Sequence, residues 1–210
     1  GFGERLLRNI RKGEFTEPTG IQRQAVPAVL LGRDVIGVAE TGSGKTAAFV
    51  WPMLVHVLDQ PEVAPGEGPV ALVCSPTREL AHQLAQETRR FCKGTGVRVG
   101  LVYGGTTKYE QVKVLRGGVE VVVCTPGRLI DHIKSGVCPM SRVTYLVLDE
   151  ADRMFSLGFG PQVWSIVSQV RPDRQTLLFS ATMGPRVERL AREALLDPVR
   201  VAVGTSDVNH

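Results

Sequence analysis

Short runs of consecutive apolar residues alternate along the chain with longer stretches that mix apolar and polar positions. The apolar runs are rich in β-branched residues and mostly lack a polar face, as expected for strands that are covered on both sides. The pattern predicts seven strands: Val35–Val38, Val70–Cys74, Val97–Val102, Val119–Cys124, Tyr145–Leu148, Thr176–Phe179 and Val199–Val201.

Stretches with helical patterns separate these runs. They predict six helices: Thr46–Leu58, Glu79–Phe91, Tyr109–Leu115, Arg128–Lys134, Gln162–Val170 and Arg186–Leu195. Alternation of strand and helix at this spacing is typical of a mostly parallel sheet with right-handed crossovers and helices on both faces. We therefore expect one doubly wound α/β domain, whose ligands bind beyond the carboxyl ends of the strands.

Composition adds little to this picture but excludes several classes of protein. The 210 residues are 43% hydrophobic and carry a formal net charge of +4. This charge is compatible with a polyanionic partner, but many soluble proteins carry as much, so it does not by itself indicate one. No run approaches the roughly 18 apolar residues of a membrane span. The cysteines form no C-x-x-C pair, so neither a zinc knuckle nor a redox motif is indicated, and we expect a reducing, intracellular compartment. They are Cys74, Cys92, Cys124 and Cys138.

A glycine-rich segment follows the first strand and opens a helix. It reads Ala39-Glu40-Thr41-Gly42-Ser43-Gly44-Lys45-Thr46. Glycines let the backbone curl so that successive N–H groups face an anion, and the helix N-terminus adds its dipole. Lys45 is expected to reach the β- and γ-phosphates of a nucleotide, and the Thr46 hydroxyl to ligate Mg²⁺. The alternative is an ordinary glycine-rich turn, and Ala39 stands where the usual pattern has glycine.

A second chemical element follows the strand Tyr145–Leu148. Asp149 at the end of that strand is expected to lie beside Thr46 and to hold the Mg²⁺ shell. Glu150 is then well placed to orient or deprotonate an attacking water. A solvated acidic loop is the alternative for either residue alone, and the phosphate loop makes it the weaker one.

The run Asp149-Glu150-Ala151-Asp152 is the signature of the DEAD-box ATP-dependent RNA helicases, and the chain resembles that family from residue 15 to residue 203. The resemblance implies a RecA-like P-loop NTPase fold, with ATP or ADP and Mg²⁺ as cofactors. It also implies that alanine, as at Ala39, is usual at the start of the phosphate loop in this family. Ser180-Ala181-Thr182 matches the motif that couples hydrolysis to strand separation, and its two hydroxyls, on Ser180 and Thr182, should lie within reach of Asp152.

Residues 15–22 resemble the family's Q motif, in which an aromatic residue stacks on adenine and a glutamine amide reads the base edge. These roles fall on Phe15 and Gln22. An amide offers a donor and an acceptor side by side, which fits the N6/N7 edge of adenine. Gly20 replaces the usual proline. The family's separate upstream aromatic is expected before residue 1, since Phe2 lies too close to Gln22. Core packing is the alternative for Phe15.

Three further stretches resemble the RNA-binding motifs of the family, and each follows a predicted strand. They would grip the sugar–phosphate backbone of single-stranded or short duplex RNA without reading its sequence. Helix capping by the threonines and surface ion pairs of the arginines are the alternative. The expected RNA-binding residues are Pro76, Thr77, Arg78, Gly104, Gly105, Thr125 and Arg128.

Complete DEAD-box enzymes have a second RecA-like domain, which supplies arginines to the γ-phosphate and completes the RNA channel. Nothing after Pro198 resembles it. We expect residues 1–203 to form the first domain and residues 204–210 to begin a linker. The chain alone should then bind adenine nucleotide weakly, hydrolyse ATP very slowly and unwind no duplex.

Several stretches are most similar to a subgroup associated with the U2 particle of the spliceosome, namely Gly32–Gln60, Val122–Ile133 and Val170–Thr182. This finer resemblance implies a role in mRNA splicing, spliceosomal protein partners and a nuclear location. Two alternatives to an unwinding enzyme stay open. One is an ATP-gated clamp that holds RNA, and the other, disfavoured by the Q motif together with Asp149–Asp152, is a P-loop ATPase acting on DNA.

Overall fold

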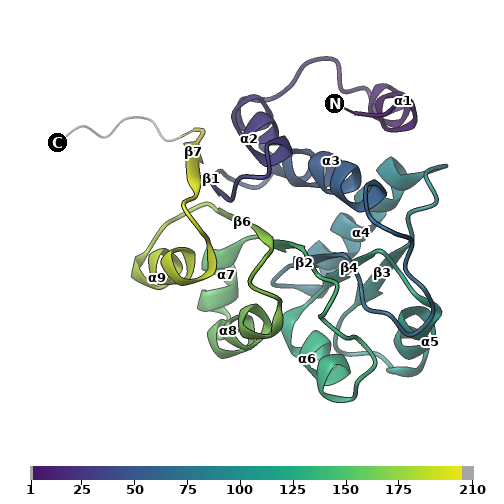
Figure 1. The fold of residues 1–210 in the computed structure, drawn as a ribbon. Coiled ribbons are helices and arrows are strands. Elements are labelled where there is room, and N and C mark those ends of the chain that lie inside the picture. Colours follow the sequence, from purple (N-terminus) through teal and green to yellow (C-terminus); the bar gives the residue numbers. More distant parts are fainter. Residues whose placement is uncertain (1, 205–210) are drawn as a thin grey trace.

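A computed structural model describes residues 2–204, which form one seven-stranded sheet with helices on both faces (Figure 1). The strands are β1 (Val35–Val38), β2 (Ala71–Cys74), β3 (Val99–Val102), β4 (Val121–Cys124), β5 (Tyr145–Leu148), β6 (Gln175–Ser180) and β7 (Val199–Ala202). Their order in the sheet is β3-β4-β2-β5-β6-β1-β7, and every neighbouring pair is parallel. The predicted doubly wound fold is confirmed.

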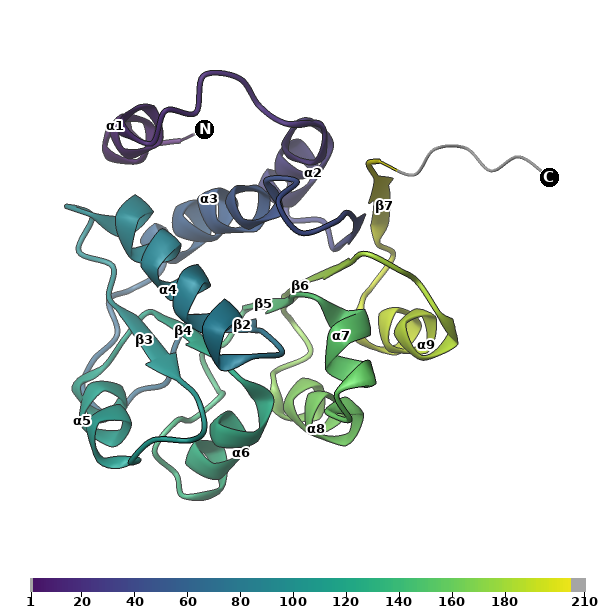
Figure 2. The same ribbon diagram turned by 180° about the vertical axis from the view of Figure 1, so that it is seen from behind.

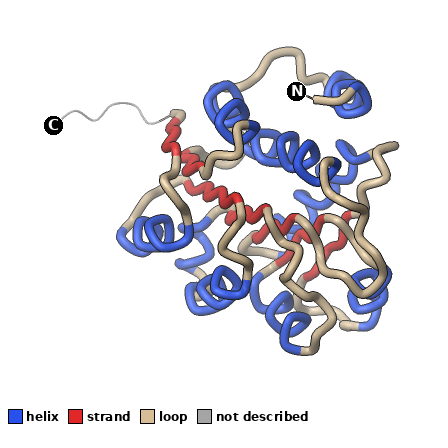
Figure 3. Tube along the Cα trace, viewed as in Figure 1, coloured by secondary structure: helices blue, strands red, loops and turns tan. Residues whose placement is uncertain are grey.

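Nine helices lie in the described part of the chain. They are α1 (Glu4–Lys12), α2 (Gly20–Leu30), α3 (Lys45–Leu58), α4 (Arg78–Cys92), α5 (Tyr109–Gly117), α6 (Pro126–Lys134), α7 (Ala151–Ser156), α8 (Gly160–Gln169) and α9 (Pro185–Ala194). Helices α1–α4 cover one face of the sheet and α5–α9 the other, so the strands lie between two helical layers (Figure 3). No helix in residues 2–204 is long and apolar enough to cross a bilayer.

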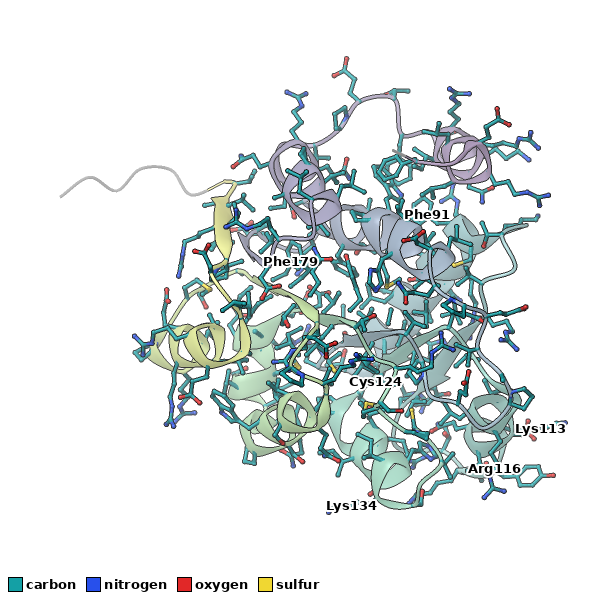
Figure 4. All side chains as sticks on the ribbon, viewed as in Figure 1. Phe91, Lys113, Arg116, Cys124, Lys134 and Phe179 are labelled. Atoms are coloured by element: carbon teal, nitrogen blue, oxygen red, sulfur yellow. The ribbon has the colours of Figure 1, made fainter. Side chains whose placement is uncertain are left out.

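Successive residues of each central strand enter two different hydrophobic cores. In β2, Val73 packs with the α1–α4 layer, whereas Leu72 and Cys74 pack with the α5–α9 layer. Figure 4 marks both cores: Phe91 and Phe179 belong to the first, and Cys124 to the second. This is why the strands read as continuous apolar runs, because both of their faces are buried.

Three helices were not predicted from the sequence. Helix α2 contains Pro27, which removes a backbone donor and normally argues against a helix. Burial of Ile21, Ala25 and Val29 along one side of α2 outweighs that cost. Helix α7 has only six residues, too few to show a helical period. Helix α1 has so many charged residues that its few apolar positions do not form a recognisable helical pattern in the sequence.

The strand order divides the carboxyl edge of the sheet into two halves. The three predicted RNA-binding stretches follow β2, β3 and β4, which are neighbours at one end of the sheet. The phosphate loop, Asp149 and Ser180 follow or end β1, β5 and β6, which are neighbours in the other half. The expected linker, residues 204–210, lies outside the described residues except for Gly204.

Candidate functional site

The phosphate loop turns on two glycines with left-handed backbone conformations. Gly42 has φ 85° and Gly44 has φ 87°, a region that side chains rarely adopt. A Cβ atom at Gly44 would lie 2.7 Å from the Gln22 Nε2 atom, so glycine is required there for space as well. The loop ends at the N-terminus of α3, and the buried Ser43 hydroxyl has no hydrogen-bond partner among residues 2–204. These features form a cradle for an anion at the helix start.

Lys45 is 5% exposed and lies between two carboxylates. Its Nζ atom is 3.2 Å from Asp149 Oδ1 and 3.5 Å from Glu150 Oε1. Burial raises the pKa of Asp149, and the attraction of Lys45 offsets only part of that rise. Lys45 therefore contacts both of the other side chains predicted to be catalytic, although it lies about 100 positions before them in the sequence.

Glu150 sits in a strained backbone conformation for a residue with a side chain, with φ 52° and ψ 51°. Its carboxylate accepts a hydrogen bond of 3.0 Å from the Thr41 hydroxyl and lies 3.6 Å from Arg153. Since the neighbouring structure holds this conformation, the Glu150 side chain faces the phosphate loop rather than solvent. Strain of this kind is typical of functional positions.

The predicted metal ligands are both at this site, but the structure pairs Asp149 with Lys45 rather than with Thr46. A cavity of about 360 Å³ is lined by Thr46, Asp149 and Glu150, together with the phosphate loop. A hydroxyl and carboxylates are the oxygen donors that Mg²⁺ prefers. The residues present thus fit the nucleotide phosphates and their cation.

The predicted coupling residues form a connected hydrogen-bond network. Thr182 donates to the Asp152 carboxylate through its hydroxyl (2.9 Å) and its amide (3.1 Å). Ser180 Oγ accepts from the Asp152 amide at 3.1 Å and donates to the Thr182 carbonyl at 2.7 Å. Burial raises the pKa of Asp152, but hydrogen bonds from Thr182, Arg153 and Ser180 outweigh it and leave the pKa below its ordinary value.

Gln22 lies against the phosphate loop. It is 2% exposed, its Nε2 donates to the Gly44 carbonyl at 3.0 Å, and its Oε1 accepts from the Thr19 amide at 3.0 Å. Each end of the amide keeps one further hydrogen-bonding position. Reading of adenine by Gln22 stays a prediction, and its link to the phosphate loop is an added role.

Phe15 lies in an aromatic cluster. Its ring centroid is 5.3 Å from that of Trp51 and 5.7 Å from that of Phe91, in edge-on and tilted arrangements. These contacts favour the packing alternative for Phe15. Stacking of Phe15 on adenine stays a prediction.

The predicted RNA-binding stretches meet at their half of the carboxyl edge. The exposed Arg78 guanidinium lies 5.0 Å from the centre of the Tyr103 ring, and 4.0 Å from where a Cβ of Gly105 would be. Gly104 and Gly105 are exposed, and Gly105 has φ 85°. Arg78 and the two glycines therefore offer one continuous surface to a phosphate backbone.

Other members of the predicted RNA set have structural partners. The Thr77 hydroxyl caps α4 by accepting from the Leu80 amide at 3.3 Å, as the capping alternative required. Arg128 donates to the Thr106 carbonyl at 3.0 Å and so holds the loop that carries the glycines. Thr125 forms no side-chain cap on α6, and Pro76 is buried. Their contacts with RNA stay predictions.

Comparisons with known proteins agree with this arrangement. The family model described as DEAD/DEAH box helicase matches residues 19–190. The chain belongs to the DEAD/DEAH box helicase family. It is 62% identical to the DEAD-box ATP-dependent RNA helicase 24 of Arabidopsis thaliana and 59% identical to the human ATP-dependent RNA helicase DDX42, in each case over 97% of this chain.

The chain covers 27% of the Arabidopsis protein and 22% of the human protein, so it spans about a quarter of the length of these relatives. Among solved structures, the yeast DEAD-box splicing factor Prp28 superposes with a TM-score of 0.89 at 40% identity, over 93% of this chain and 47% of that one. The predicted RecA-like fold is thereby confirmed for this DEAD-box domain.

Two polar residues of this DEAD-box domain line the phosphate cavity and were not predicted to be site residues. Gln83 and Glu87 lie four positions apart on α4, so they share one side of that helix. Burial raises the pKa of Glu87, although Arg90 opposes it. Their spacing was visible in the sequence, but nothing there indicated that this side of α4 faces the phosphate loop.

Proposed function

We propose that this chain is the ATP-binding domain of an ATP-dependent RNA helicase, in which ATP hydrolysis is coupled to RNA binding and local unwinding. The observation that carries the proposal is the contact of Lys45 with Asp149 and Glu150 beneath an anion cradle. The hydrogen bonds of Asp152 with Ser180 and Thr182 connect that contact to β6.

The chemistry follows from these positions. The phosphate loop amides and Lys45 bind the β- and γ-phosphates of ATP, and a nucleotide competes with the two carboxylates for the Lys45 charge. Glu150 orients the attacking water and accepts its proton. Thr46 and Asp149 would hold Mg²⁺, which neutralises the charge that develops on the phosphates.

The RNA half of the proposal rests on the arrangement of exposed donors after β2, β3 and β4. Arg78 and the backbone at Gly104 and Gly105 are free to contact phosphates, whereas Arg128 acts by holding that loop in place. Such contacts give binding that does not depend on base sequence. Single-stranded or short duplex RNA is the expected substrate.

A second RecA-like domain would complete the enzyme. Of the residues that line the phosphate cavity in the described chain, Lys45 is the only cation. Phosphoryl transfer in this class of ATPase uses a further arginine for the charge of the transition state. We assign that arginine to a second domain of the same protein.

The biological setting is also a proposal. Prp28, to which this chain is 40% identical, is called a splicing factor. Together with the resemblance of Gly32–Gln60, Val122–Ile133 and Val170–Thr182 to a U2-associated subgroup, this favours a role in mRNA splicing, spliceosomal protein partners and a nuclear location.

The proposal is tested by measuring how a protein that holds both domains binds a labelled RNA of about ten nucleotides. The measurement includes an ATP analogue that resists hydrolysis, and DNA of the same sequence as competitor. Arg78→Ala should weaken RNA binding by about 1 kcal/mol, while Arg171→Ala, an arginine paired with Asp173, should not. Equal competition by DNA contradicts RNA specificity. RNA binding that needs ATP but shows no repeated turnover indicates the clamp instead.

A further inference from the structure

Six basic side chains come together at the amino edge of the sheet, on the far end of α4 and on the helix that packs there. We call them the basic surface. They are Arg5, Arg8 and Lys12 of α1 and Arg89, Arg90 and Lys93 at the end of α4. Positions 5, 8 and 12 share one side of α1. It borders the end of α4: the Arg5 side chain donates to the Gly94 carbonyl, and the Arg90 side chain donates to the Lys12 carbonyl.

None of the six forms an ion pair with a carboxylate in residues 2–204, although all are exposed. Other exposed arginines are divided: Arg33, Arg171, Arg189 and Arg200 have such partners, whereas Arg23, Arg116 and Arg186 have none among the described residues, but those three lie apart from one another in the sequence and do not form a cluster of six. Cations at the end of a helix are stabilised by the helix dipole, which accounts for part of the pattern at α1 and α4. The dipole does not account for six neighbouring cations that form no ion pair in the described part of the chain, even though Arg90 attracts the half-buried Glu87 on its own helix.

An apolar cavity of about 730 Å³ adjoins the basic surface, between α1, α2 and α3. This volume is within the range of roughly 300–1,000 Å³ that is usual for ligand sites. Arg5 and Thr95 line it and join it to the basic surface, and Leu30 and Leu58 at its rim are 39% and 51% exposed. Its carboxylates, Glu4 and Asp59, make no ion pair with the six cations.

The position of this region separates it from the site described above. Helix α4 has 15 residues, so its far end lies about 20 Å from Arg78. Figure 2 shows that end of α4 beside α1. A partner bound here leaves the carboxyl edge, and with it the nucleotide and RNA sites, accessible.

We propose that the cavity and the basic surface together bind an acidic, amphipathic protein segment. Its large apolar side chains fill the cavity, and its Asp or Glu residues pair with Arg8, Lys12 and Lys93. Helix-in-groove recognition combines an apolar face with charges at its border in this way. RNA is the weaker candidate, because a phosphate backbone would use the cations and leave the apolar cavity empty.

The test is a selection of random displayed peptides of about 15 residues, long enough for four helical turns. Peptides selected on the wild-type protein are synthesised, labelled and measured by fluorescence anisotropy. The surface variant carries Arg8→Glu, Lys12→Glu and Lys93→Glu, which spare the cations that hold backbone carbonyls. The control variant carries Lys113→Glu, Arg116→Glu and Lys134→Glu, three basic residues labelled in Figure 4 that lie on α5 and α6, on the opposite face of the sheet from α1, α2 and α3.

We expect the selected peptides to combine acidic with large apolar residues, to bind the surface variant about tenfold more weakly and to bind the control variant normally. A second variant, Leu58→Asp, should weaken the same peptides, and ADP binding should confirm that each variant is folded. Failure to enrich any peptide, enrichment of other compositions, or equal affinity for the surface variant overturns the proposal. A surface variant that loses RNA binding but keeps peptide binding also overturns the proposal, because the basic surface would then bind nucleic acid.

Discussion

At the scale of single residues, the central feature is a buried positive charge shared by two carboxylates. Lys45 is held by Asp149 and Glu150 at the place where nucleotide phosphates are expected. Removing one member of such a buried group leaves the others without compensation, which is costly in a region of low dielectric. The predicted roles of these residues came from motif and strand order, whereas their mutual contact could be seen only in the fold.

Glu150→Gln separates binding from chemistry. The amide can still accept the hydrogen bond from Thr41 but cannot take a proton from water. We expect a protein with both domains to bind ATP normally and to hydrolyse it about 10²–10⁴ times more slowly. Glu193→Gln, an exposed partner of Arg189, is the matched control and should be active. Normal turnover in Glu150→Gln would mean that another group positions the water.

At the scale of elements, all seven strands and six helices were predictable because their apolar patterns are long or continuous. Boundaries moved by a few residues, as at β3, which begins at Val99 rather than Val97. The sequence did not predict α2, since Pro27 disfavours a helix that only tertiary packing supports. The sequence predicted only an adenine-reading role for Gln22. Its hydrogen bond to the Gly44 carbonyl could not be predicted, because this bond joins two segments that are distant in the sequence.

One ion pair between a part-exposed arginine, Arg98, and a buried carboxylate, Glu120, fixes the start of β3 to the start of β4. Glu120 accepts from the Arg98 guanidinium and amide and from the Val63 amide, so it also anchors the loop at residues 61–69. Burial raises the pKa of Glu120, but Arg98 and the backbone donors outweigh burial and lower it. The stabilisation is therefore present above the unfolded pKa of about 4.3 and is lost as the pH falls through the lower folded value.

Arg98→Met leaves the Glu120 carboxylate buried without its cation. We expect the variant to lose about 1–2 kcal/mol of unfolding free energy at neutral pH, less than for a fully buried pair because the Arg98 side chain is 40% exposed and water can partly replace it. The loss should shrink as the pH falls, since Glu120 then becomes protonated in the folded variant. Urea unfolding at several pH values measures this, with Arg171→Met as the exposed control. A loss that does not depend on pH would exclude the ion pair as its cause.

At the scale of the whole molecule, the proposed nucleotide and RNA sites share the carboxyl edge of the sheet, and the basic surface with its cavity lies at the opposite edge. The phosphate cavity is lined by a single cation in the described residues, which is too few for the charge of a phosphoryl-transfer transition state. In the proposed function, this domain binds the nucleotide and positions the water, and a second domain supplies the remaining positive charge.

The consequence is a large difference in rate between the chain alone and a protein that also carries the second domain. We expect the 210-residue chain to hydrolyse ATP roughly 10³-fold or more slowly, and to unwind no duplex, because the transition state lacks an arginine. Steady-state phosphate release with saturating RNA measures both proteins. Comparable rates would show that the chain contains every group that the chemistry needs.

The most direct test of the central claim is titration of the protein with fluorescent ADP and GDP, with and without Mg²⁺. The account predicts saturable binding that prefers ADP and weakens by about tenfold or more in Lys45→Ala, which removes the charge that faces the phosphates. Gln22→Ala should reduce the preference for adenine. Binding that Lys45→Ala leaves unchanged would contradict the assignment of the phosphate site.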